Sequence, residues 1–264
     1  MTISQQKWEL DTQEYLNVCN ITAALPRQQI YEFSRGVNNL GLWTSMVCWP
    51  LRSSQNAATG NTMFSLGGLG AFNGTMANTP TRGADGMVFT DHTNQHISTA
   101  LTPALDHCIF ASTQCNAEGA DANVVAGCRP AGDRVPTHSG WSLGQSWSRV
   151  FRLPIWSPDG TLDNVGPTAI TNGSFSTLYG RLSFSGATKL TGLTLNAGTE
   201  TVASGARGSA TLEALTLGNQ NVSNATSSLG GALPFFAYFA VSSLNNVALR
   251  DLYKQTLGQG ITLP

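Results

Sequence analysis

Residues 234–241, PFFAYFAV, decide the fold of this 264-residue chain. A short aromatic run of this length predicts a buried strand. The polar residues 242–246 interrupt it, and residues 247–257 then repeat apolar side chains at helical spacing. That helix places four large side chains on one face: Leu249, Leu252, Tyr253 and Leu257. We therefore predict a buried strand followed directly by an amphipathic helix at the C-terminal end.

Upstream of this pair, from residue 61 onward, short apolar segments alternate with turn residues in the rhythm of a β-sandwich. Asn172-Gly173 is a hairpin signal, and Pro158-Asp159-Gly160 is a turn in which proline presets φ and glycine accepts a positive φ. Residues 105–113 predict a strand with Cys108 and Phe110 on one face and Ile109 and Ala111 on the other. The chain is expected to be all-β.

Five segments, taken in order, carry a family resemblance: residues 83–89 (GADGMVF), 195–198 (LNAG), 202–204 (VAS), 215–218 (LTLG) and 235–253. They resemble the laminin-G-like, concanavalin A-like jelly-roll modules. The lead-in, residues 30–51, resembles the segment before such a jelly roll in bacteriophage virion proteins. The resemblance implies an antiparallel jelly-roll β-sandwich over residues 51–264, with a helical N-terminal extension over residues 1–50 and a C-terminal helix.

Two helices are predicted in the extension. Asp11 and Glu14 have the spacing of a capping box, which predicts a short helix from residue 11 to Val18. Pro26 suits the first position of a second helix that ends at Gly41. We expect the second helix to pack on the sandwich. Residues 1–20 are expected to form an assembly arm whose contact residues are Trp8, Tyr15 and Leu16.

Composition excludes some function classes. Charged residues make up 11% of the chain, against roughly 25% in ordinary soluble domains. The net charge is −1 and there is no basic patch, so neither a nucleic-acid partner nor a membrane surface is expected. The longest apolar run, residues 232–241, is about half of a membrane span, and no apolar signal-peptide core follows Met1. We expect a protein made in the host cytoplasm and assembled into a virion.

The sequence lacks the common catalytic patterns of hydrolases on this and other folds. The six glutamates contain no Glu-x-Asp-x-Glu strand motif of the kind that glucanases on a concanavalin-like fold use to flank one glycosidic bond. No Gly-x-Ser-x-Gly elbow occurs, and residues 67–70 (GGLG) lack the Lys-Ser/Thr of a phosphate loop and predict a tight turn. The chain is expected not to be an enzyme.

Candidate ligand residues lie in the loop-rich middle of the chain. Trp141, Trp147 and Trp156 are candidates for stacking on host glycan, although core packing or subunit contact accounts for tryptophans in general. Asp159 and Asp163 are candidate calcium ligands at a sheet rim, and no other cofactor is expected.

The five cysteines, at an odd count and without a C-x-x-C, are expected to be buried thiols. A Cys108–Cys128 or Cys115–Cys128 bridge is the alternative.

These observations favour a structural protein of a bacteriophage virion, a decoration, head-fibre or tail-surface module that contacts other virion proteins and forms a homo-oligomer, by default a trimer. Two alternatives stay open. One is a carbohydrate-binding adhesin on the same fold, recognising a host surface glycan. The other is a polysaccharide hydrolase with an unfamiliar site.

Overall fold

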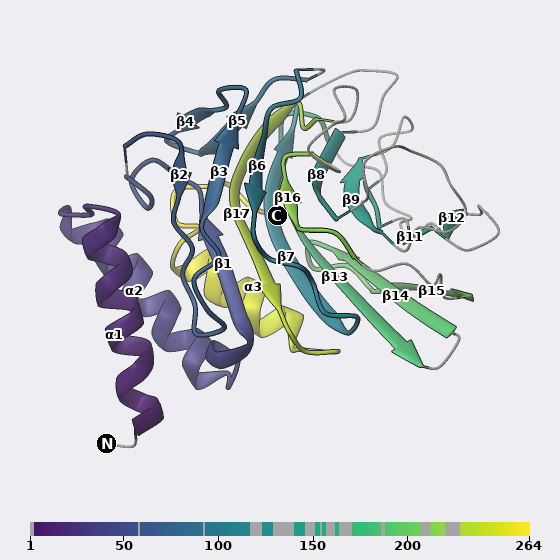
Figure 1. Cartoon of the computed structure of the whole chain (residues 1–264), viewed down its shortest axis with the longest axis horizontal. Coiled ribbons are helices and arrows are strands. Elements are labelled where there is room, and N and C mark those ends of the chain that lie inside the picture. Colours follow the sequence, from purple (N-terminus) through teal and green to yellow (C-terminus); the bar gives the residue numbers. More distant parts are fainter. Residues whose placement is uncertain are drawn as a thin grey trace.

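The computed structural model describes most of the chain: residues 3–57, 59–91, 93–116, 123–128, 140–145, 151–153, 155–156, 162–163, 171–185, 188–206, 212–219 and 228–264. Two antiparallel sheets stack face to face, and three α-helices lie against the outer face of the larger sheet (Figure 1). The architecture is the predicted antiparallel jelly-roll β-sandwich with helices near both ends of the chain. This confirms the fold class.

The larger sheet, sheet A, has eight strands in the order β15-β14-β13-β7-β17-β5-β4, with β1 also paired to β17. Its strands are β1 (Met46–Pro50), β4 (Thr81–Gly83), β5 (Gly86–Phe89), β7 (His107–Cys115), β13 (Phe175–Ser185), β14 (Thr188–Leu195), β15 (Thr201–Ala206) and β17 (Gly231–Phe239). Strand β17 pairs with β7 along one side. On its other side it pairs first with β5 and then with β1.

The smaller sheet, sheet B, has seven strands in the order β10-β9-β8-β16-β6-β3-β2. Its strands are β2 (Thr62–Met63), β3 (Gly74–Ala77), β6 (His96–Thr99), β8 (Asn123–Gly127), β9 (Ser142–Gln145), β10 (Phe151–Arg152) and β16 (Thr216–Leu217). A separate pair joins β11 (Ile155–Trp156) to β12 (Leu162–Asp163). The short strands β2, β3, β4 and β6 were not predicted individually, because strands of two to four residues show too little alternation.

Strand β17 is apolar throughout because both of its faces are covered. Leu233, Phe236 and Tyr238 point into the core between the sheets. Phe235 and Phe239 point to the opposite face, toward the helices. All nine residues of the strand are buried. A strand that is covered on both faces has a continuous apolar sequence, which explains why residues 234–241 do not alternate with polar residues.

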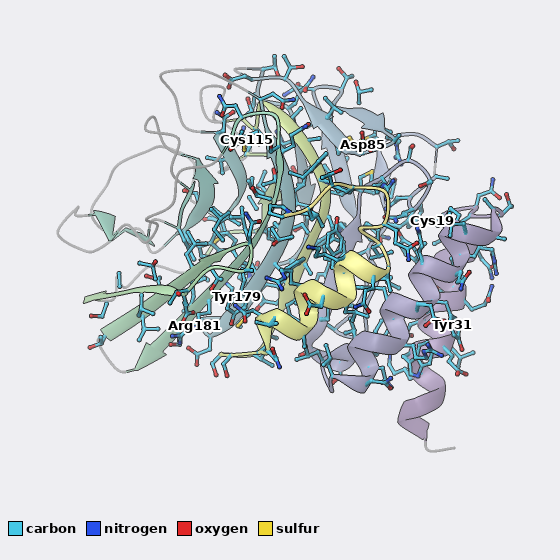
Figure 2. All side chains as sticks on the ribbon, turned by 180° about the vertical axis from the view of Figure 1, so that it is seen from behind. Cys19, Tyr31, Asp85, Cys115, Tyr179 and Arg181 are labelled. Carbon is cyan, nitrogen blue, oxygen red and sulfur yellow. The ribbon has the colours of Figure 1, made fainter. Side chains whose placement is uncertain are left out.

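The helices α1 (Ile3–Val18), α2 (Ala24–Asn39) and α3 (Asn246–Gln255) form a second core with sheet A; a 3₁₀ turn (Trp43–Ser45) leads from α2 into β1. The Phe235 ring lies at its centre, 5.3 Å from the Phe33 ring of α2 and 5.0 Å from the Tyr253 ring of α3. Leu252 packs where a side chain on Gly36 would stand, so α2 and α3 approach closely at that glycine. Figure 2 shows the three helices on this side of the sheet.

The N-terminal helix differs from its prediction. Helix α1 starts at Ile3, so Asp11 lies inside it and does not cap it. The Asp11 carboxylate instead accepts hydrogen bonds from Lys7, one turn earlier, and from the Trp43 indole. The second helix begins at Ala24, two residues before Pro26.

The predicted boundary at residue 50 falls at the end of β1, which is a strand of sheet A. The second core therefore joins residues from both sides of that boundary. Within the described part of the chain, no helix combines the length and the apolar character that crossing a membrane requires.

Candidate functional site

A hollow lies between α1 and the loop of residues 64–73 that connects β2 to β3; we call it the α1 groove. Its volume of about 310 Å³ is at the lower end of the range of roughly 300–1,000 Å³ that small-molecule sites occupy. One wall is the helix face that carries Lys7, Asp11, Glu14, Tyr15 and Val18. These positions recur at helical spacing, so a single face of α1 presents them together.

The opposite wall is the 64–73 loop, which contributes Phe64, Ser65, Gly67, Gly70, Ala71 and Asn73. Glycine is required in this loop because the loop packs closely on β1 and on Trp43. Gly67 has a φ of +138°, and a Cβ there would collide with the carbonyl oxygen of Met46, so only glycine lets the loop lie this close to β1. Backbone hydrogen bonds from Gly68 to Trp43 and from Leu69 to Met46 fix the loop. The tight turn predicted for residues 67–70 is confirmed.

Trp43 connects the two walls. Its indole Nε1 donates to Asp11 Oδ2 over 3.1 Å, and its ring fills the space above Gly68. Lys7 Nζ donates to the same carboxylate oxygen over 2.7 Å. The position of Asp11 is thus set from two sides. The α1 wall therefore carries two carboxylates: Asp11, whose charge is balanced by Lys7, and Glu14, whose side chain is exposed.

Hydrogen bonds also orient the loop side of the groove. Asn73 Oδ1 accepts from the Ser65 backbone nitrogen over 3.0 Å and from Ser65 Oγ over 3.3 Å. The Asn73 amide therefore holds its oxygen toward the loop, which leaves Nδ2 as its remaining donor group. Tyr15 lines the base of the α1 wall, and its hydroxyl donates to the Gln55 carbonyl over 2.8 Å. Burial raises the pKa of Tyr15 well above its usual value.

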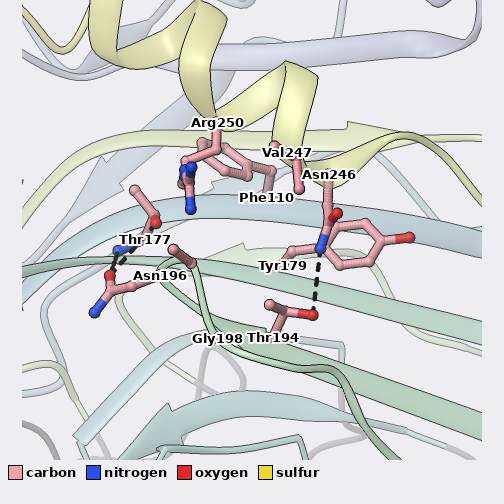
Figure 3. Close-up of a pocket in the computed structure, with 10 residues that line it drawn as sticks. Phe110, Thr177, Tyr179, Thr194, Asn196, Gly198, Asn246, Val247 and Arg250 are labelled. Carbon is pink, nitrogen blue, oxygen red and sulfur yellow. Dashed lines mark hydrogen bonds between the residues drawn. The ribbon is translucent and has the colours of Figure 1, made fainter. Parts of the chain in front are cut away.

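A second, smaller hollow lies between α3 and the strands β13 and β14 (Figure 3). Asn246 Nδ2 donates to Thr194 Oγ1 over 3.3 Å, and the Thr177 backbone nitrogen donates to Asn196 Oδ1 over 2.8 Å. Arg250 enters it from α3 while bonding Asp251. Its volume of about 20 Å³ accommodates one water-sized group and is too small for a sugar.

Beside this hollow an ion pair lies on the open part of the outer face of sheet A. Arg181 Nε and Nη2 donate to the two Glu200 carboxylate oxygens over 2.5 and 3.0 Å. The pair rests on Gly192, where a Cβ would collide with Glu200. Hydrogen bonding to Glu200 raises the pKa of Arg181 above its usual value. Two of the five guanidinium N–H groups donate to Glu200, and the two charges balance each other, so this pair contributes to the sheet surface and carries no net charge for a ligand.

The predicted glycan tryptophans do not come together in the described structure. Trp141 is completely buried in the core between the sheets, where its ring lies 5.6 Å from the His107 ring, so core packing accounts for it and its indole cannot stack on a sugar. Trp156 belongs to β11, and only its backbone is described. Trp147 lies outside the described residues.

Only one of the two predicted calcium ligands lies within the described residues. Asp163 is the last residue of β12, with its backbone paired to Ile155, and Asp159 lies outside the described residues. In the part of the chain whose side chains are described, no three His, Cys, Asp or Glu side chains gather in a way that would hold a metal ion. The calcium site stays a prediction.

The predicted arm residues pack on the protein itself. Trp8, Tyr15 and Leu16 are 5%, 3% and 3% exposed and belong to the core beneath the helices. Their side chains are therefore used for folding, and assembly through them would require α1 to leave the sheet. All five cysteines are buried and free, which confirms the expectation of buried thiols and excludes both alternative bridges from this structure.

No family model and no curated protein matches the chain. Solved structures with similar folds exist. The Trypanosoma rangeli sialidase has a TM-score of 0.57 at 11% identity, over 88% of this chain and 39% of that chain. A mutant of that sialidase displaying trans-sialidase activity gives 0.56 at 12% identity, with the same coverage. The CBM40 module of the Ruminococcus gnavus IT-sialidase, bound to α2,6-sialyllactose, gives a TM-score of 0.43 at 13% identity, over 57% of this chain and 84% of that chain.

These likenesses support the β-sandwich and correct one expectation. The expectation of a non-enzymatic protein is contradicted, because proteins similar in fold over most of this chain include enzymes. The sialidase structures named above give no support to the bacteriophage and laminin-G parts of the resemblance. At 11–12% identity the likeness shows the fold alone.

Sequence reasoning missed the α1 groove. Its two walls lie about fifty residues apart in the chain, and neither contains a motif. The one signal was the glycine run at residues 67–70, which predicted a turn and gave no indication of what the turn would face.

Proposed function

We propose that this chain binds carbohydrate and that the α1 groove is the binding site. The groove itself carries the proposal: it has the volume of a small-molecule site and combines carboxylate, amide and hydroxyl groups with the ring of Phe64 and the side chain of Val18. A sugar ring presents hydroxyl groups at its rim and C–H groups on its faces. It therefore needs polar partners and an apolar contact in the same hollow.

The fold supports the same proposal. The Trypanosoma rangeli sialidase, one structure of which is in complex with sialic acid, contains a region that resembles 88% of this chain in fold. A sandwich covered by helices on one side also makes a rigid support, since the 64–73 loop is fixed on β1 and α1 is packed into the second core. Rigid walls reduce the ordering cost of binding a small polar ligand.

The test is binding to a glycan array, followed by calorimetry on the glycans that bind. Ala71→Trp places a large ring at the exposed rim of the groove and should abolish binding. Ala84→Trp is the matched control, because Ala84 is equally exposed but lies in the β4–β5 turn outside the groove. The proposal is refuted if the wild-type protein binds no glycan or if Ala71→Trp binds as well as Ala84→Trp. Assaying the same samples for new reducing ends reports whether a bound sugar is cleaved.

The virion location, the virion partners and the trimer remain proposals that no comparison supports. Mass spectrometry of purified particles and light scattering of the pure protein test them directly. If the protein is absent from purified particles, the virion location and the virion partners are refuted. If it is a monomer at all concentrations, the trimer is refuted.

A further inference from the structure

We propose that the α1 groove selects neutral and amino sugars and rejects acidic ones. This inference rests on the proposed carbohydrate binding and concerns which sugars are bound. Although the sialidases of similar fold act on acidic sugars, the charges on the walls of this groove indicate the opposite preference.

The single cation in the described lining of the groove is already neutralised. Lys7 is the only lysine or arginine among the residues that line it, and its ammonium group donates to Asp11 over 2.7 Å. The Trp43 indole donates to the same oxygen, Oδ2. Lys7 and Asp11 therefore cancel in charge, and a ligand carboxylate that approached a remaining N–H of Lys7 would also meet the negative charge of Asp11.

Glu14 supplies the net charge of the groove. It lies one turn after Asp11 on the same face of α1, and its side chain is exposed. Among the described residues, no hydrogen bond or ion pair engages its carboxylate. An ionised carboxylate accepts hydrogen bonds and donates none. At this wall the groove therefore favours ligand hydroxyl or ammonium groups and repels ligand carboxylates.

The facing wall complements this arrangement. Since Asn73 Oδ1 is occupied by Ser65, its Nδ2 is available to donate to a ring or hydroxyl oxygen of the ligand. Gly70 and Ala71 leave room for close approach on the same side. A sugar that bridges the groove must therefore donate toward α1 and accept from the loop. Hydroxyl groups satisfy both demands, and a protonated amine satisfies the first more strongly.

Three probes separate the sugar classes: a glucosamine tetramer, its N-acetylated counterpart and 3′-sialyllactose. By calorimetry at low salt and at a pH that keeps the amine protonated, we expect the glucosamine tetramer to bind about tenfold more tightly than the N-acetylated form. This is the order of magnitude that one hydrogen bond between charged groups contributes. 3′-Sialyllactose should bind most weakly. Raising the salt concentration should reduce the preference for the amine, because the site is partly exposed.

Glu14→Gln keeps the size of the side chain and removes its charge. It should abolish the roughly tenfold preference for the glucosamine tetramer over its N-acetylated counterpart. Gln13→Ala is the control, because Gln13 lies on the same helix but bonds Asn17 outside the groove.

The selectivity is overturned if 3′-sialyllactose binds as tightly as the amine, or if Glu14→Gln retains the preference. If neither these probes nor any array glycan binds, the proposed function itself fails, which is a distinguishable result.

Discussion

Acidification should destabilise this protein through one buried histidine. His107 begins β7 and is completely buried, with its ring between those of Trp141 and Tyr238 at 5.6 and 5.3 Å. Its Nδ1 donates to the Ala104 carbonyl over 2.6 Å, and its Nε2 has no hydrogen-bond partner in the described structure. Burial lowers the pKa of His107 from 6.5 to about 4, since the charged ring would lie among apolar groups; the Ala104 carbonyl and Asp106 act against this shift.

Whether acid stabilises or destabilises the protein follows from which state binds the proton more readily. The unfolded chain, with a histidine pKa near its usual value, takes up the proton more readily than the folded protein does. Stability is therefore lost as the pH falls below 6.5, and the loss levels off below about pH 4. With these two pKa values, the free energy of unfolding falls by about 2 kcal/mol at pH 5 and by about 3 kcal/mol at pH 4, relative to pH 8.

The assay is urea unfolding followed by tryptophan fluorescence at several pH values between 8 and 4. His107→Asn and His107→Phe remove the titrating group and should flatten the pH dependence by these amounts. Each variant is compared with itself at pH 8, so its own packing defect cancels. If wild-type and variant proteins lose stability in parallel between pH 7 and pH 5, His107 does not titrate as the structure indicates.

Three further outcomes are expected. Phe235→Ala should lower the free energy of unfolding by about 3–5 kcal/mol in denaturant titrations, because it empties the centre of the second core, whereas exposed Val202→Ala should change it by less than about 0.5 kcal/mol. Gly231→Ala should prevent or severely impair folding, measured by circular dichroism, since φ is +155° and a Cβ would collide with the Gln114 carbonyl. All five thiols should resist a thiol reagent until the protein unfolds, because burial raises the pKa of each, to about 11 for Cys108 and to about 12 for Cys19, Cys115 and Cys128.

The parts of the fold that could be predicted are those where local pattern and tertiary burial agree. Residues 107–115 alternate as predicted, with Ile109 and Ala111 facing sheet B and Cys108 and Phe110 facing the helices. The C-terminal helix appears within one residue of its predicted start. Here the apolar periodicity is long and uninterrupted, so it identifies the element type reliably.

The parts that could not be predicted depend on contacts between distant segments. Asp11 and Glu14 have capping-box spacing, but the Asp11 carboxylate accepts hydrogen bonds from Lys7 and Trp43 instead. No local sequence pattern reveals a partner such as Trp43, 32 residues away. Trp141 lies in the loop-rich middle of the chain, where the sequence left both glycan contact and core packing open. Its burial results from packing against His107, which begins a strand more than thirty residues earlier. The α1 groove exists only because α1 and the 64–73 loop meet across β1.

The position of β17 has a consequence for biosynthesis. This strand is made last among the strands, yet β1, β5 and β7 all hydrogen-bond to it. Because translation proceeds from the N-terminus, the emerging polypeptide carries the aromatic surfaces of α2 and β7 uncovered until residues 231–264 leave the ribosome. Sheet A can therefore be completed only after β17 has been synthesised, and a product terminated before β17 would expose unsatisfied strand edges to aggregation and to proteases.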